Sequence, residues 1–271
     1  MRIIKQIDYY KIMNILCRYL LLILFAGLLS ACSNSSSETN STLPDISTFN
    51  NSPSDQFIVD INVIADGHMY RGKNANDPHT GAHVHFQSNS GITPEWPEGT
   101  LPEDYPAIYA FADGTISKVD TYYEVTNPEK THYRYGVTLD FAQQNGQTIK
   151  MSYSIEPMID PGDDTFYIDY IKVSDGDTVS KGDVIAYMYL STDATINKDH
   201  HIHFNLIKNN ATQAPVLFTS DIMSQFVEKI STANGGVRNF DASDWMGDCM
   251  GYKVDQTENP YNESAFDCLT L

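Results

Sequence analysis

Histidine is the residue type with the clearest capacity for chemistry in this sequence, because six of the eight histidines fall into two short clusters. One cluster lies in the segment PHTGAHVHF, and the other lies in DHHIHFNL, over 100 residues later. The clustered histidines are His79, His83, His85, His200, His201 and His203. Imidazole is the commonest protein ligand for zinc, and a catalytic zinc site needs three protein ligands and one open position. The two clusters therefore predict a shared metal site.

The spacing inside the clusters is typical of β-strands. In an extended strand, side chains two residues apart point to the same face. His83 and His85 should therefore share one face of their strand, and His201 and His203 should share one face of theirs. His79 lies four residues before His83, which suits a ligand pair if a turn lies between them.

The elements that would position these histidines are short β-strands within residues 57–220. Turn signals such as Asn145-Gly146 separate runs in which apolar and polar residues alternate. The runs cover residues 57–65, 107–125, 135–143, 148–156, 183–190 and 201–208. Strands do not alternate with helices, so the predicted fold is all-β, an antiparallel sandwich or barrel-like sheet. Apolar residues at helical spacing predict a helix at about residues 221–231, followed by an irregular tail.

The N-terminus carries an export signal. The apolar run YLLLILFAGLL is 11 residues long, whereas a membrane-spanning helix needs roughly 20. Basic residues precede the run and LSAC follows it, which is typical of a signal peptide. The segment resembles the bacterial lipoprotein signal, and this resemblance implies lipidation of Cys32. It also implies a protein anchored to a membrane by lipid, and Ser33 favours the outer membrane facing the periplasm.

Composition then divides the chain into four segments. These are a lipoprotein signal peptide (1–31), a flexible tether rich in Ser and Asn (32–56), the β domain (57–220) and a C-terminal helix with its tail (221–271). Cys249 and Cys268 lie in the tail and are the pair left after signal removal and lipidation. Because an exported compartment is oxidising, we expect a disulfide between them. The rival interpretation is a pair of metal-ligating thiolates.

Charge limits the partners of the protein. The chain has 17 Lys and Arg residues against 35 Asp and Glu, so its formal net charge is −18. Nucleic-acid binding needs a basic surface, which argues against a nucleic-acid partner. At 41% hydrophobic residues, the chain can still build a core.

Four segments together resemble the lysostaphin-type zinc endopeptidases, a peptidoglycan-cleaving family with a duplicated-hybrid-motif fold. HHIHFNL is similar to the HxH motif of the family, and VSDGDTVSKGDVIAYM (173–188) is similar to the hairpin before that motif. AIYAFADGTISKVD (107–120) is similar to the strand pair that follows the first metal motif. That first motif, H-x-x-x-D, matches residues 79–83 with histidine in place of aspartate. The resemblance covers about residues 65–208.

The resemblance implies a site and an activity. His79, His83 and His203 match the zinc ligands, with His85 the replacement if His83 is not a ligand. His201 matches the histidine that handles the proton of the attacking water, and His200 and His85 are possible supporting residues. Three neutral imidazoles still suit Zn²⁺ and leave the metal its full double charge. The implied substrates are the stem peptides of peptidoglycan, cleaved by metal-activated water.

One departure from the family leaves two functions open. The family has a further catalytic histidine in a Tyr-x-His segment, and Tyr153-Ser154-Ile155 matches it with isoleucine at the last position. Isoleucine cannot donate a hydrogen bond to an oxyanion, so His85 or His132 would have to compensate. The first function is a zinc endopeptidase acting on peptide crosslinks. The alternative is a non-catalytic member that binds peptidoglycan, a metal or a partner protein.

Overall fold

The computed structural model describes most of the chain between residues 43 and 232. The described residues are 43–68, 70, 81–86, 101–126, 131–158, 165–190, 200–213 and 217–232. They belong to the second of two compact units, Leu43–Leu271, and the first unit is Met1–Thr42. The expectations for Cys32, His79, Cys249 and Cys268 lie outside the described residues. Within the part that is described, no helix is long and apolar enough to span a membrane.

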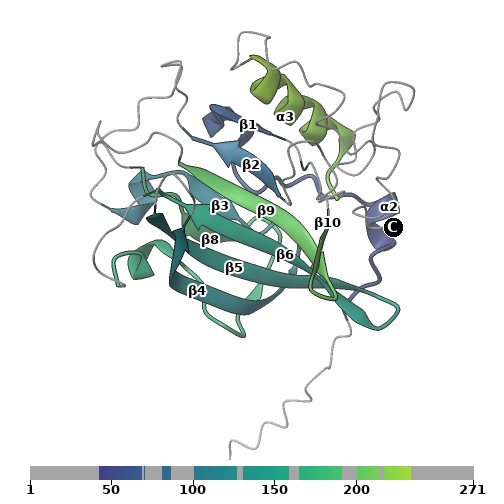
Figure 1. The fold of residues 1–271 in the computed structure, drawn as a ribbon. Coiled ribbons are helices and arrows are strands. Elements are labelled where there is room, and N and C mark those ends of the chain that lie inside the picture. The colour runs from purple at the N-terminus through teal and green to yellow at the C-terminus, as the bar shows by residue number, and fades with distance from the viewer. Residues whose placement is uncertain are drawn as a thin grey trace, which may run out of the picture. The chain divides into compact units, whose positions relative to one another are not determined.

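A large antiparallel sheet forms the centre of the fold (Figure 1). Across the described residues it has eight strands in the order β1-β2-β9-β6-β5-β4-β7, and β10 also pairs with β9. A second sheet pairs β3 with β8. The strands are β1 (Asp66–His68), β2 (Ala82–His85), β3 (Ala107–Tyr109), β4 (Gly114–Thr126), β5 (Thr131–Gln144), β6 (Gln147–Glu156), β7 (Thr178–Val179), β8 (Val184–Tyr187), β9 (His201–Lys208) and β10 (Ala211–Gln213). The predicted all-β antiparallel class is confirmed.

Short helical segments complete the described chain. They are α2 (Thr48–Asn51), η1 (Ile61–Val63), η2 (Pro102–Asp104), η3 (Ile168–Tyr170) and α3 (Ser220–Thr232). Helix α3 agrees with the predicted helix, and it contacts β1 and η1. Its Ile222, Met223 and Phe226 are buried, and the Phe226 ring lies 5.2 Å from the ring of Phe57. The apolar face of the helix therefore closes one side of the core.

Two stretches differ from the sequence expectations. Residues 57–65 do not form a strand, because Asp60 caps the 3₁₀ turn η1 by accepting a hydrogen bond from the backbone of Asn62. Residues 43–56, expected within the flexible tether, pack on the β domain. Ile46 is fully buried there, and its N–H donates to the Gln143 carbonyl at 2.8 Å. Phe49 also packs against the core, with its ring 5.4 Å from that of Phe141, and the buried Ser54 hydroxyl donates to the Phe111 carbonyl. Apolar contacts and hydrogen bonds together therefore hold this polar segment.

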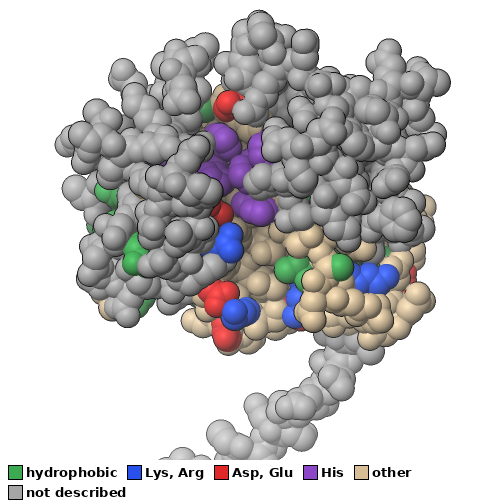
Figure 2. Space-filling view, in the orientation of Figure 1, with side chains coloured by type: hydrophobic (Ala, Val, Ile, Leu, Met, Phe, Trp, Pro, Cys, Tyr) green, Lys and Arg blue, Asp and Glu red, His purple; other side chains and the backbone are tan. Residues whose placement is uncertain are grey.

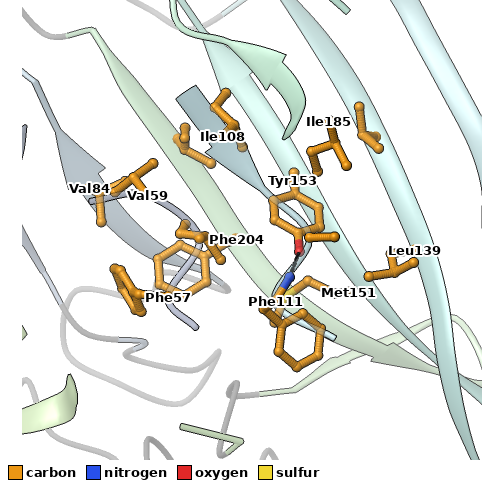
Figure 3. Close-up of a cluster of buried hydrophobic side chains, with 14 of the residues drawn as sticks. Phe57, Val59, Val84, Ile108, Phe111, Leu139, Met151, Tyr153, Ile185 and Phe204 are labelled. Atoms are coloured by element: carbon orange, nitrogen blue, oxygen red, sulfur yellow. Dashed lines mark hydrogen bonds between the residues drawn. The ribbon is translucent and has the colours of Figure 1, made fainter. Parts of the chain in front are cut away.

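The hydrophobic core lies between the two sheets (Figure 3). Alternate residues of the large sheet point into it and meet residues of the β3–β8 sheet. Fully buried side chains include Val84, Ile108, Met151, Tyr153, Ile185 and Phe204. The phenol oxygen of Tyr153 accepts a hydrogen bond from the Phe111 N–H at 3.2 Å, as Figure 3 shows. One face of the large sheet is therefore committed to packing, and the other is available for chemistry.

A tight turn joins β5 to β6, the strand that lies beside β9. Asn145 and Gly146 both have positive φ angles, 53° and 76°, as a tight two-residue hairpin turn requires. The turn signal at this position was correctly read from the sequence. The turn sets the pairing of β6 with β5 beside it, up to a register shift between Asp140 and Ala142, and β6 pairs with β9 along its other edge.

Candidate metal site

Strand pairing brings the two histidine clusters together. In the β2–β9 pair, His83 lies opposite His203 and His85 lies opposite His201. Directly opposed residues of antiparallel strands project from the same face of the sheet. All four imidazoles therefore leave the face opposite to the core, which we call the site face. This register is the physical reason why two clusters over 100 residues apart in the sequence lie side by side.

Neighbouring strands extend the pairing into two rows of side chains. The first row, across β1, β2, β9 and β6, contains His68, His83, His203 and Ser154. The second row, across the same strands, contains Asp66, His85, His201 and Glu156. Figure 2 shows histidine side chains gathered on one face of the molecule. The site is thus a short β-sheet surface on which imidazoles are bordered by carboxylates.

Three of these imidazoles lie close enough to hold one metal ion. The ligand atoms offered by His83, His85 and His201 all lie within 4.8 Å of one another. Nδ1 of His83 is 3.3 Å from Nε2 of His85, and the His83 and His201 ring centroids are 4.4 Å apart. His83 and His201 are buried, whereas His85 is partly exposed. The cluster can therefore be reached from solvent on the side of His85.

His203 is held differently from the other three. Its ring centroid lies 5.0 Å from that of His83, but the ring packs directly on the backbone of Gly81. A Cβ atom on residue 81 would overlap the imidazole, so a larger residue there would displace the ring from this position. The glycine of the His79-Thr80-Gly81 segment thus has a steric role. His203 is beside the three-imidazole cluster, without being one of its three members.

The remaining predicted residues are placed as follows. His200 comes one residue before β9 and is buried, and its carbonyl accepts a hydrogen bond from the Phe86 N–H at 3.0 Å. This bond prolongs the pairing of β2 with β9, which is a structural role for the backbone of His200. His79 lies outside the described residues, as does the side chain of His132.

Ile155 does not lie at the site, in contrast to the sequence expectation. It pairs with Ile202, and both side chains are fully buried on the core face. Strand alternation explains the difference, because a shift of one residue moves a side chain to the opposite face of a sheet. The β6 residues on the site face are Ser154 and Glu156. The two β6 positions that pair with the β9 histidines are therefore occupied by a serine and a glutamate.

Glu156 is a site residue that sequence reasoning missed. The side chain is buried, and Oε2 lies 3.5 Å from Nε2 of His201. Oε1 lies 3.5 Å from a guanidinium nitrogen of Arg134 and accepts a hydrogen bond from the Ser154 hydroxyl at 3.1 Å. Strict alternation along TIKMSYSIE, with Ile149, Met151, Tyr153 and Ile155 inward, was the signal that could have found it.

His68 is the second residue that was missed. It lies opposite His83 on β1, and the two rings stack with centroids 4.2 Å apart. The segment Asp66–His68 is only three residues long, so it offers no periodic pattern to detect. Only the pairing of β1 with β2 reveals that a fifth imidazole borders the cluster.

Comparisons with known proteins find similarity among solved structures. No family model matches the sequence, and no curated protein matches it. Among solved structures, the chain is similar to the NMR solution structure of lysostaphin, with 17% sequence identity and a TM-score of 0.34. The alignment covers 59% of this chain and 51% of that chain, so the chain spans about half the length of lysostaphin.

Proposed function

We propose that this protein is a zinc-dependent hydrolase of peptide crosslinks in peptidoglycan, with the metal held by His83, His85 and His201. The observation that carries the proposal is the placement of three imidazole ligand atoms within 4.8 Å on one sheet face. When bound, zinc would polarise the scissile carbonyl and activate a water molecule for attack. The protein's own contribution is to hold three neutral ligands and leave one position open.

The donor set fits zinc better than it fits a hard cation. Three nitrogen ligands suit zinc, whereas calcium and magnesium require mainly oxygen ligands. Two of the three imidazoles are buried, so their rings are fixed by packing before a metal arrives. The partial exposure of His85 leaves an approach from solvent. A preorganised and accessible three-ligand site is the arrangement that zinc hydrolases use.

A second ligand set uses the same central residue. The set expected from sequence is His79, His83 and His203, with His201 left to move a proton. The two sets share His83 and differ in whether His85 and His201, or His79 and His203, complete the site. We favour the first set because its three ligand atoms lie together in the described structure.

The substrate part of the proposal is supported by the sequence. The segments around the histidines resemble those of peptidoglycan endopeptidases, in the same order along the chain. The predicted export signal is compatible with a substrate in the cell envelope. The acidic composition disfavours nucleic acid as the substrate. Cell-wall peptides are thus the substrate class that we propose.

The anchor is a separate proposal with its own test. We propose that Cys32 is lipidated and holds the protein on the outer membrane, facing the periplasm. Cys32→Ser should release the protein into the soluble fraction or leave the signal uncleaved. A processed Cys32→Ser protein that still sediments with the membrane would show that the lipid is not the anchor.

Digestion of purified cell wall tests the proposed activity. The zinc-loaded protein should release soluble muropeptides, chelation should stop the release, and His201→Ala should abolish it. Ser152→Ala is the matched control, because Ser152 is partly exposed on β6 and shares the face of Ser154. The control should keep the parent rate. The wall must contain crosslinks that a known endopeptidase opens under the same conditions.

The alternative is a non-catalytic metal-binding protein of the same fold. It is favoured by one observation: the β6 side chains opposite the β9 histidines are Ser154 and Glu156, where the resemblance implies a histidine. A parent protein that binds zinc and sediments with cell wall, yet releases no muropeptides, would establish this alternative.

A further inference from the structure

The contact between Glu156 and His201 carries a further inference about the site. We infer that Glu156 is a positioning residue, which fixes the tautomer of His201 so that its Nδ1 atom is the nitrogen presented to a metal. The role toward a metal rests on the proposed function, whereas the Glu156–His201 contact involves protein atoms alone.

Geometry brings the two groups together from adjacent strands. Glu156 at the end of β6 lies directly opposite His201 at the beginning of β9. Both residues are buried, and the carboxylate Oε2 is 3.5 Å from Nε2 of the imidazole. Nε2 is therefore the ring nitrogen directed at the carboxylate. Because the two residues are paired across adjacent strands, the backbone of the sheet fixes the position of both side chains.

The carboxylate is held in place from its other side. Oε1 of Glu156 lies 3.5 Å from the Arg134 guanidinium and accepts a hydrogen bond from the Ser154 hydroxyl. A buried charge is tolerated only where partners of this kind compensate for lost solvation. Arg134 and Ser154 therefore anchor Oε1 and leave Oε2 directed at His201. The carboxylate is positioned by the strand β5 as well as by its own strand.

The chemistry of the pair determines the tautomer. An ionised carboxylate can only accept a hydrogen bond, so the proton of a neutral His201 belongs on Nε2. The lone pair of the ring then lies on Nδ1, which is the nitrogen that a metal would use. A carboxylate behind a ligating histidine is a common second partner in metal sites, and it fixes ring orientation and raises ligand basicity. Glu156 would give His201 both properties.

The experiment compares the parent with Glu156→Gln in metal-free protein, with Ser152→Ala as the control, because Ser152 is partly exposed on the same face of β6. Nitrogen-15 NMR of the imidazole rings, recorded at alkaline pH where histidine is neutral, reports the tautomer of His201 directly. The parent and Ser152→Ala should carry the proton on Nε2, whereas Glu156→Gln should show a mixture of tautomers. Zinc titration of the same samples should show an affinity loss of about 10–100-fold for Glu156→Gln. Glu156→Asp, which keeps the charge, should recover part of that loss.

The outcomes separate this inference from the proposed function. A parent His201 protonated on Nδ1 would overturn the inference, and so would a Glu156→Gln protein with unchanged tautomer and zinc affinity. If the tautomer shifts as expected but no sample binds zinc, the positioning contact stands and the proposed zinc function fails. If Glu156→Gln does not fold, the tautomer of the parent decides the question.

Discussion

The two faces of strands β6 and β9 differ completely, although their residues alternate one by one along the same backbone. The core face carries Tyr153, Ile155, Ile202 and Phe204, all of them fully buried among other apolar groups. The site face carries the row residues Ser154, Glu156, His201 and His203. Stability and chemistry are thus separated by the two-residue period of a β-strand. The separation implies that neighbouring substitutions should have different consequences, which the following predictions measure.

The largest expected effect comes from placing a histidine on the core face of β6. Ile155→His would bury an imidazole among apolar side chains, which should lower the free energy of unfolding by about 3–5 kcal/mol. It should add nothing to zinc affinity, because the new ring lies on the wrong face. Ser152→His places the same ring on the site face, which Ser152 shares with Ser154, and should change stability by less than about 1 kcal/mol. Urea denaturation measures both. An Ile155→His protein of parental stability with tighter zinc binding would contradict the assignment of the faces.

Zinc binding to the site face should raise the free energy of unfolding of the protein. Zinc at about 100 times its dissociation constant should stabilise the folded protein by about 2.7 kcal/mol, because only the folded state assembles the ligands. His83→Ala should lose this stabilisation, and Ser152→Ala should keep it. Thermal unfolding with zinc and with a chelator makes the comparison. Equal zinc stabilisation of the parent and His83→Ala would place the metal elsewhere.

Removing the cation behind Glu156 should have an intermediate effect. Arg134→Gln leaves a buried carboxylate with weaker compensation, which should cost about 1–3 kcal/mol, reduced because Arg134 is partly exposed. Lys150→Gln is the control, since its ion pair with Asp140 lies at a more exposed place on the same sheet. That change should cost less than about 1 kcal/mol. Equal losses of stability for the two variants would mean that the Arg134–Glu156 contact stabilises the fold no more than a surface ion pair does.

The smallest expected effect concerns a polar atom on the core face. Tyr153→Phe removes the acceptor of the Phe111 N–H and should cost about 1–2 kcal/mol near neutral pH. Burial raises the pKa of Tyr153, partly offset by the hydrogen bond from Phe111. The Tyr153 phenol therefore ionises more easily in the unfolded chain, where its pKa is about 10. The free energy of unfolding should fall as the pH rises above that value. Tyr153→Phe should show a shallower alkaline fall. An identical fall in both proteins would contradict this.

Much of this architecture could be predicted from local patterns. The alternating runs gave the strands β5, β6 and β9, and Asn145-Gly146 gave the tight turn between the first two. The two H-x-H pairs correctly indicated imidazoles sharing one face, because that inference needs only the strand period.

The remaining features were missed for two reasons, a misassigned strand face and contacts between distant segments. Ile155 was assigned to the site and Glu156 was overlooked, although a shift of one residue exchanges their faces. His68 became visible only through the pairing of β1 with β2. Ile46, in a polar stretch, gave no periodic signal for its burial. Alternation along its own strand was enough to find Glu156, whereas for His68 and Ile46 the deciding information is a partner in a distant segment.

The ligand set is tested most directly by zinc titration of His85→Ala and His203→Ala beside the parent, under identical conditions with a competing chelator. The parent should bind one zinc ion. His85→Ala should bind it on the order of 10²–10³-fold more weakly, because a few ligands share a binding free energy of about 10–16 kcal/mol. His203→Ala should stay within about tenfold of the parent, which is the limit expected for a neighbour that does not coordinate. The reverse order of the two variants, or a parent that binds no zinc, would contradict a metal site built on His83, His85 and His201.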